Sequence, residues 1–436
     1  MSFTLSNSDC VESLSKDQFI LVDCNNFYVS CERLFNPNLE KKPVVVLSNN
    51  DGCVISRSQE AKLLGVKMGE PYFQIKALCE SRNIQVFSSN YALYGDISER
   101  IMNLLFEHAP DLDIYSIDEA FLKYPSSVAP SDLVSLCHEL QKKVKKWVGM
   151  PISLGLANTK TLAKMANDLA KKIQNSYVFD LNSSVRQKVL QNYLIGDVWG
   201  IGRNLKEKLN GMNIHTAWEY AQMDPSIIRK RLGVIGERIL WELRGVSCLE
   251  SDEKVSKKSL LYSRSFGHVL SEITPLSEAL STYVYTVAEK LRAQGSLAKA
   301  LYIFLEYQIQ PGKKMRYYDS ITEIFPAPTK DTGEMIKAAK RGLNKIFRRE
   351  ERYKKCGVIL LDLLPESSSN SDLFLNPVDP KRTQLMNTMD ALNARFGKKK
   401  LFFGAMGTDV SWKSRKDCSS KHNPSNWQQL PIVLAK

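Results

Sequence analysis

Short apolar runs alternate with amphipathic stretches through the first 180 residues. Helical spacing of apolar side chains predicts helices over 91–108, 131–148 and 161–172. The runs with the length and β-branched content of buried strands are 18–23, 43–47, 84–88, 112–117 and 152–156. This mixed order predicts an α+β domain in which helices cover a sheet.

Residues 183–246 have a different pattern, with helices and short loops. A turn followed by a helix is predicted for VWGIGRNLKEKL (198–209), and the same pattern recurs in GVIGERILWELRG (233–245). The polar stretch 247–259 then reads as a linker.

A second α+β pattern follows the linker. Helices are predicted over 276–294 and 333–348, and strands over 260–267, 300–308, 315–325 and 356–364. The order strand, helix, strand, strand, helix, strand is that of a split βαβ domain. Beyond it, ESSSNSD (366–372) is disorder-prone, and only 381–395 shows a weak helical pattern.

Composition restricts the class of protein. The chain has 436 residues, 43% hydrophobic and 25% charged, and no apolar run approaches the roughly 20 residues that span a bilayer. Residues 1–17 lack the basic start and apolar middle of a secretory signal. Nine cysteines without a CxxC pair indicate reduced thiols in a cytoplasmic protein, and the five scattered histidines argue against a zinc site.

Charge is distributed unevenly along the chain. The net charge is +13, yet the first 180 residues are slightly acidic, so the basic excess lies downstream. This distribution suits a catalytic unit that holds cations, followed by modules that bind a polyanion. A basic surface kept only for solubility is the alternative that charge leaves open.

The candidate chemistry lies at YSIDEAF (115–121), where Asp118 and Glu119 follow strand-forming residues. Asp23 lies at the end of another predicted strand. If the two strands are neighbours, three carboxylates converge at one sheet edge, where their repulsion favours two Mg²⁺ ions. Such a pair of ions suits in-line phosphoryl transfer. Because most DE pairs lie on surfaces, the pair alone is weak evidence.

DCNNFYVSCE (23–32) and YSIDEAF resemble the two acidic motifs of the Y-family DNA polymerases. Residues 41–71 and LGLANTKTLAKMANDLAKK (154–172) are similar to that family throughout. VVVLSNNDGCVI, FSSNYALYGD, VWGIGR and SRSFG resemble its UmuC-type subgroup, which includes plasmid-borne relatives. The likeness covers about residues 18–365, and TQLMNTMDALNARFGKKKLFF is the clearest part of the tail.

The resemblance implies a right-hand polymerase fold with these parts: N-terminal extension 1–17, palm 18–34 and 86–180, fingers 35–85, helix-hairpin-helix thumb 181–246, linker 247–258, split-βαβ little finger 259–365 and partner-binding tail 366–436. The implied activity is low-fidelity, template-directed DNA synthesis past lesions in the SOS response, because short fingers leave an open active site. Primer-template DNA and dNTP would be its substrates. The implied protein partners are a processed UmuD-type dimer, a RecA filament and the sliding clamp.

The resemblance also implies residue roles around the metal ions. Asp23 and Asp118 would bridge two Mg²⁺ ions, Glu119 would bind the ion that activates the primer 3′-hydroxyl, and the Cys24 backbone carbonyl would complete the nucleotide-side ion. Tyr28 would be the steric gate that excludes a ribose 2′-hydroxyl. Without the resemblance, Tyr28 would be interpreted as an ordinary core tyrosine.

Nucleotide contacts are implied for Phe27, Tyr28 and Lys171. Where many relatives carry a Tyr-x-x-Arg pair for the triphosphate, this chain has Gln59 and Lys62. A lysine cannot make the two parallel hydrogen bonds that an arginine guanidinium makes to a phosphate. Arg57 is therefore a further candidate for the triphosphate contact.

DNA contacts are expected downstream. Gly200 and Gly202 would let backbone N–H groups approach a phosphate, with charge from Arg203 and Lys206. Arg264, on the first strand of the second α+β pattern, is a further phosphate candidate. SNSDLFL (369–375) loosely resembles a clamp-binding peptide through Leu373 and Phe374, but lacks the usual glutamine.

Two other classes of protein remain open at this point. Another two-metal enzyme, such as a nuclease or nucleotidyl cyclase, would share the carboxylates but has no use for a sugar gate. A non-catalytic DNA-bound scaffold would not need Asp23, Asp118 and Glu119.

Overall fold

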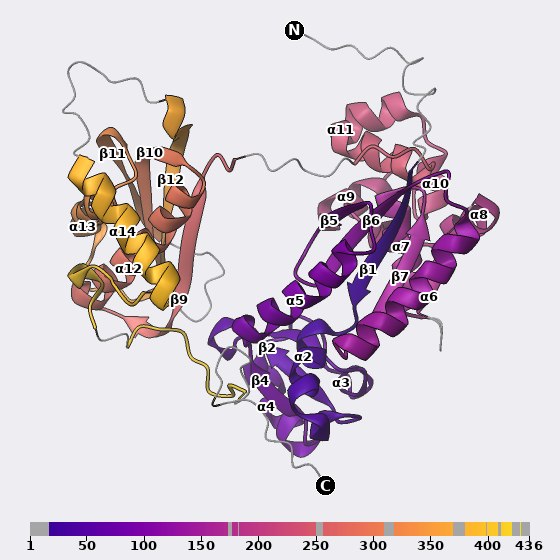
Figure 1. Cartoon of the computed structure of the whole chain (residues 1–436), viewed down its shortest axis with the longest axis horizontal. Helices are drawn as coiled ribbons and strands as arrows, with labels where there is room; N and C mark the ends of the chain where they lie inside the picture. Colours follow the sequence, from indigo (N-terminus) through magenta and orange to yellow (C-terminus); the bar gives the residue numbers. More distant parts are fainter. Residues whose placement is uncertain are drawn as a thin grey trace. The chain divides into compact units, whose positions relative to one another are not determined.

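The fold comes from a computed structural model that describes residues 17–172, 177–181, 183–249, 256–308, 318–368, 380–397, 399–408, 411–420 and 428. The chain forms two compact units (Figure 1). The first comprises Met1–Ser48, Gly52–Asp252 and Cys418–Lys436, and the second comprises Asn49–Asp51 and Glu253–Asp417.

A five-stranded sheet is the centre of the first unit. Its order is β5-β6-β1-β7-β8, with bounds Asp111–Ile114, Glu119–Pro125, Asp17–Cys24, Ile152–Ala157 and Val178–Asp180. β1 lies in the middle and pairs antiparallel with β6 and β7. Because both faces of β1 are covered, its sequence is a continuous apolar run rather than an alternating one.

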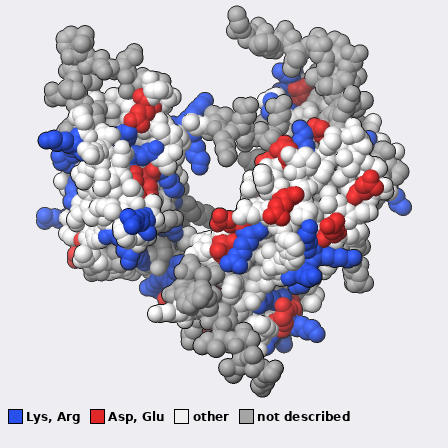
Figure 2. All heavy atoms as spheres, in the orientation of Figure 1, with Lys and Arg blue, Asp and Glu red and all other residues white. Residues whose placement is uncertain are grey.

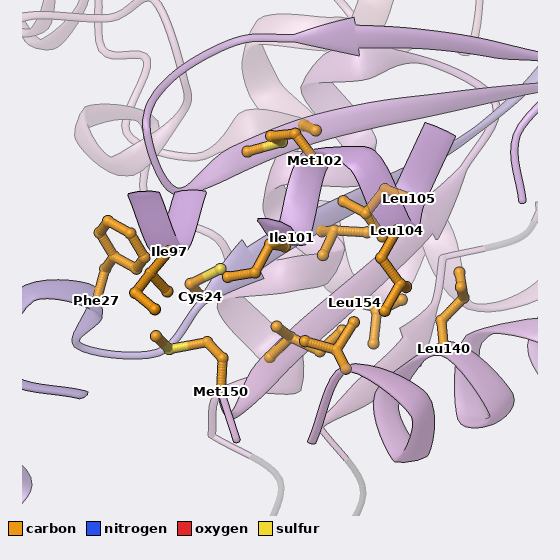
Figure 3. Packing of buried hydrophobic residues seen from close by; sticks show 14 of the residues in the cluster. Cys24, Phe27, Ile97, Ile101, Met102, Leu104, Leu105, Leu140, Met150 and Leu154 are labelled. Atoms are coloured by element: carbon orange, nitrogen blue, oxygen red, sulfur yellow. The ribbon is translucent and has the colours of Figure 1, made fainter. Parts of the chain in front are cut away.

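Helices cover both faces of this sheet. Ile20 and Val22 face a core built with α2 (Phe27–Phe35), α5 (Tyr91–Phe106) and α6 (Pro130–Trp147). Figure 3 shows part of this core, including Ile101 of α5 and Leu154 of β7. Phe19 and Leu21 point to the other face, where α7 (Lys160–Ala170) packs.

A smaller sheet in the first unit has the order β3-β2-β4. Its strands are Val54–Arg57, Val44–Leu47 and Gln85–Ser88, and the adjoining helices are α3 (Gln59–Leu63) and α4 (Tyr72–Ser81). The sequence predicted β2 and β4 but neither β3 nor the helices α2, α3 and α4.

The helical part of the first unit follows the main sheet. Its helices are α8 (Ser183–Asn192), α9 (Arg203–Asn210), α10 (Ala217–Ala221) and α11 (Pro225–Leu243). Gly233 interrupts α11 with a φ of 75°, a backbone conformation that favours glycine. The break lies where the sequence predicted a turn before a second helix.

The second unit has the predicted order of strands and helices. Its elements are β9 (Leu260–Leu270), α12 (Ile273–Ala293), β10 (Ser296–Tyr307), β11 (Tyr318–Thr329), α13 (Thr332–Ile346) and β12 (Tyr353–Pro365), and its sheet order is β11-β10-β12-β9. Figure 2 shows Lys and Arg side chains over much of this unit.

The segment expected to be a tail contributes to the second unit. α14 (Pro380–Phe396) confirms the weak helical pattern, and its Met386 and Met389 form a small core with Tyr285 of α12 and Met406. Its Asp390 receives two hydrogen bonds from Arg292, at 2.6 and 2.8 Å. The described residues between 380 and 417 therefore belong to the second unit.

One strand expectation was wrong in position. The pair Asp118-Glu119 does not end a strand over 112–117: β5 ends at Ile114, and β6 begins at Glu119. A turn replaces the predicted strand end because the Ser116 side chain hydrogen-bonds the backbone there.

In the described part of the chain, no helix is long and apolar enough to cross a membrane.

Candidate active site

Asp23 and Glu119 come from adjacent strands. They are paired positions in the antiparallel ladder of β1 and β6. The Cys24 backbone N–H donates to the Asp118 carbonyl at 3.0 Å, which joins the turn to the end of β1. The three acidic positions that the sequence singled out therefore lie at one end of two paired strands.

The turn before β6 is organised by Ser116, which sequence reasoning missed. Its Oγ accepts hydrogen bonds from the backbone N–H groups of Asp118 and Glu119, at 3.2 and 3.0 Å. The same hydroxyl donates to Asp118 Oδ1 at 2.7 Å. A serine two residues before an aspartate is a recognisable turn signal that could have identified it.

Two lysines contact the carboxylates: Lys164 of α7 and Lys171, the C-cap residue of that helix. Lys171 Nζ lies 2.8 Å from Asp23 Oδ2, and Lys164 Nζ lies 2.9 and 3.1 Å from the two Glu119 oxygens. Being seven residues apart, both lysines project from one side of the helix. Lys164, also missed from sequence, lies over the Tyr115 ring at 4.4 Å.

Burial raises the pKa of the Asp23 carboxyl to about 7, with Lys171 opposing the rise and Glu119 adding to it. A carboxyl crowded in this way gains from a neighbouring cation. As the side chains lie, the described residues contain no group of three or more His, Cys, Asp and Glu side chains placed to hold a metal ion. The oxygen donors at this edge nevertheless suit a hard divalent cation.

α7 is fastened closely to the sheet. A Cβ on Gly155 of β7 would lie 2.3 Å from backbone atoms of Ala163 and Asn167, so only glycine allows this approach. The buried Asn167 amide donates to the Ser153 and Leu21 carbonyls at 2.8 and 3.3 Å. These contacts hold the helix that carries both lysines.

A fully buried glutamate of α11, Glu242, secures the start of α7. Its Oε2 accepts from the Thr161 backbone N–H at 3.0 Å. Its Oε1 accepts from the backbone N–H groups of Cys248 and Leu249, at 2.7 and 3.2 Å. One carboxylate thus joins three segments of the first unit, and sequence alone gave no signal for it.

The residues after β1 enter α2 through Asn26, whose φ of 47° is left-handed. Phe27 is buried in the core, whereas Tyr28 is half-buried. Burial raises the pKa of the Tyr28 hydroxyl, with smaller contributions from Tyr91 and Asp118. Tyr28 lies four residues after the end of β1, the strand that carries Asp23.

The charges of the basic candidates Arg57 and Lys171 both act on the third, Lys62. Burial lowers the pKa of Lys62, the charges of Arg57 and Lys171 lower it further, and Asp23 opposes them. The Arg57 guanidinium donates to the Val66 carbonyl. These three cations give the acidic edge a positive neighbour suited to phosphates.

The glycine turn 200–202 lies at the start of α9. Gly200 has a φ of 88°, and Gly202 is the N-cap residue. The Arg203 side chain is exposed and pairs with Glu207 at 3.1 Å, and the Lys206 side chain packs against Gly196.

The remaining candidates belong to the second unit. Arg264 of β9 lies over the Tyr262 ring at 5.5 Å and lines a cavity of about 420 Å³ together with Lys355. Leu373 and Phe374 lie outside the described residues.

Comparison with known proteins adds family evidence to this geometry. The impB/mucB/samB family model matches residues 22–168, and the model of that family's C-terminal domain matches 257–373. A domain of unknown function matches residues 383–433.

Curated relatives span almost the whole chain. The Salmonella typhimurium protein ImpB is 38% identical over 95% of this chain and 99% of its own length. Protein UmuC of Salmonella typhimurium LT2 is 39% identical over 94% and 99%. DNA polymerase IV 1 of Bacillus subtilis is 27% identical over 88% and 92%.

The fold is also similar to solved structures. A Y-family DNA polymerase chimera aligns with a TM-score of 0.65 at 21% identity, covering 80% of this chain and 99% of that one. An insertion ternary complex of Dbh DNA polymerase aligns with a TM-score of 0.53, also at 21% identity and with the same coverage.

Proposed function

The chain belongs to the impB/mucB/samB family of Y-family DNA polymerases and is a DNA-directed DNA polymerase of translesion synthesis, and we propose that its reaction takes place at the edge formed by Asp23, Asp118 and Glu119. The observation that carries this assignment is the pairing of Asp23 with Glu119 across β1 and β6, with Asp118 held beside them by Ser116. Primer-template DNA and dNTP are the proposed substrates.

The proposed cofactor is a pair of Mg²⁺ ions. Asp23, Asp118 and Glu119 would hold them with the Cys24 carbonyl, and bound ions would activate the primer hydroxyl and neutralise the leaving pyrophosphate. Lys171 and Lys164 supply positive charge to the same carboxylates from α7.

The other residues of the site bind and select the nucleotide. Arg57, Lys62 and Lys171 would contact the triphosphate, because the charges of Arg57 and Lys171 both act on Lys62, and Lys171 pairs with Asp23. The half-buried Tyr28 ring would lie against the incoming sugar and exclude a 2′-hydroxyl. The Phe27 ring is buried, so a nucleotide contact by this residue would come from its backbone.

DNA would be held by Gly200, Gly202, Arg203 and Lys206 in the first unit and by Arg264 in the second. We further propose a processed UmuD-type dimer, a RecA filament and the sliding clamp as partners, and the cytoplasm as the location. Leu373 and Phe374 remain the candidate clamp contacts.

Primer extension with Asp118→Asn tests the assignment. Because one cation ligand loses its charge, we expect extension on undamaged and lesion-bearing templates to fall at least about a hundredfold, while binding of primer-template DNA persists. Asp132→Asn, a change at an exposed position of α6, is the matched control and should keep parental extension.

Two outcomes would contradict the assignment. Unchanged, Mg²⁺-dependent extension by Asp118→Asn would remove the carboxylate from the mechanism. Primers shortened rather than lengthened by the parent would favour a nuclease, and DNA binding without any primer change would favour a scaffold.

A further inference from the structure

Tyr28 lies in a cluster of aromatic side chains from α2 and the first turn of α5. The rings of Tyr28 and Tyr94 are stacked, with centroids 4.5 Å apart and an interplanar angle of 21°. Tyr91 meets both rings edge-on, at 6.1 and 6.2 Å. One face of the Tyr28 ring is therefore covered by another ring.

Tyr94 is held more firmly than Tyr28. It is fully buried, and its hydroxyl donates to Glu32 Oε1 at 2.7 Å. Glu32 is itself 3% exposed and lies four residues after Tyr28, one turn further along α2. A single side chain thus contacts two successive turns of α2, with its ring on Tyr28 and its hydroxyl on Glu32.

A steric gate excludes a larger sugar only if its ring cannot move aside. The half-buried Tyr28 side chain has staggered alternatives about its first torsion, and a new sugar oxygen would press it toward them. The stacked Tyr94 ring fills the space behind Tyr28, and the close-packed core resists its displacement. Movement of the gate away from the sugar would therefore require Tyr94 to move as well.

We propose that Tyr94 is a specificity-determining positioning residue that backs the Tyr28 ring and so enforces the choice of deoxyribose over ribose. The inference rests on the proposed function, in which Tyr28 is the gate. It assigns to Tyr94 no contact with the nucleotide.

The test compares selectivity, defined as kcat/KM for dNTP divided by kcat/KM for the matching rNTP, in single-nucleotide primer extension. Tyr94→Leu removes the stacked ring, and we expect selectivity to fall about two- to tenfold, the range that an aromatic pair contributes. Tyr94→Phe keeps the ring and loses only the hydrogen bond to Glu32, so its selectivity should fall less.

Tyr124→Leu is the matched structural control. Tyr124 is a buried tyrosine of the same core whose hydroxyl also hydrogen-bonds, to the His108 carbonyl, but it belongs to β6 and not to the aromatic cluster. It should lower the melting temperature with parental selectivity. If Tyr94→Leu is not recovered folded, Tyr94→Met replaces it, because methionine adapts to core gaps.

A double variant separates this inference from the proposed gate. Tyr28→Ala alone should admit rNTPs, and adding Tyr94→Leu should then change selectivity no further. If Tyr28→Ala leaves selectivity unchanged, the gate role itself fails. If Tyr28→Ala relaxes selectivity but Tyr94→Leu behaves like Tyr124→Leu, or lowers selectivity by the same factor with Tyr28 absent, the backing role of Tyr94 is overturned.

Discussion

Lys164 and Lys171 each contact a different carboxylate of the site, so α7 brings two positive charges to the acidic edge. The two differ in exposure: the Lys164 side chain is 16% exposed and the Lys171 side chain 39%. The more exposed Lys171, whose charge also acts on Lys62, is the better placed to exchange Asp23 for a phosphate.

Lys171→Ala should therefore weaken nucleotide use. Loss of one charge-assisted contact predicts a fall in kcat/KM for dNTP of about ten- to a hundredfold, mainly through KM, in steady-state primer extension. The neighbouring Lys172→Ala is the control, because Lys172 is exposed and pairs with Asp168. Equal effects of the two variants would contradict a specific role for Lys171.

Part of this candidate site was predictable from the sequence for physical reasons. Asp23 and the pair Asp118-Glu119 were recognisable because acidic residues beside apolar runs are unusual. Ser116 and Lys164 were missed because their roles depend on a turn and on a helix face meeting another strand. The end of the strand predicted over 112–117 was misplaced, because the apolar pattern continues past Ile114 into the turn at Ser116.

At the scale of elements, α7 depends on contacts that are distant in sequence. Residues 161–172 were predicted as a helix, and the structure has Lys160–Ala170. Periodicity could not show that Glu242, 81 residues away from Thr161, accepts a hydrogen bond from the first turn of this helix. Such pairings follow from tertiary packing rather than from local pattern.

Glu242→Gln should loosen the start of α7. An amide group in place of one carboxylate oxygen would face backbone N–H donors and leave at least one buried donor unpaired, at a cost of about 1–3 kcal/mol. We expect amide hydrogen exchange of residues 160–163 and 246–249 to accelerate about tenfold or more. Glu207→Gln, at an exposed pair on α9, should leave these amides unchanged.

If Glu242→Gln leaves the amide hydrogen exchange of residues 160–163 and 246–249 unchanged, other contacts hold α7 in place. In that case, the close approach at Gly155 and the Asn167 hydrogen bonds would be sufficient anchors.

At the scale of the whole molecule, residues 380–417 contribute to the second unit. The sequence pattern showed little core there because the apolar residues of α14 are few, and their small core with Met406 includes Tyr285 of α12. The Arg292 side chain is 6% exposed and also donates a hydrogen bond to the Thr332 hydroxyl at 2.8 Å. The ion pair between Arg292 and Asp390 is therefore part of the packing of the second unit.

Asp390→Asn should destabilise the second unit. The buried Arg292 would lose its charged partner, and because Asp390 is 28% exposed we expect a loss of about 1–3 kcal/mol, seen as a lower thermal midpoint. Lys337→Ala, which breaks an exposed pair with Glu334, is the control and should leave the midpoint unchanged. An unshifted midpoint in Asp390→Asn would mean that α14 adds little to this unit.

The division of the chain places residues 253–417 in one unit and Cys418–Lys436 back in the other. Within the first unit, Cys418 exchanges hydrogen bonds with Ser88 at 2.9 and 3.0 Å. Besides the short excursion at Asn49–Asp51, the backbone thus passes between the units after Asp252 and again after Asp417. A recombinant hybrid that borrows residues 253–417 from a relative would need a splice after Asp252 and another after Asp417. A protease that cut only one of these two passages would leave the two bodies covalently joined through the others.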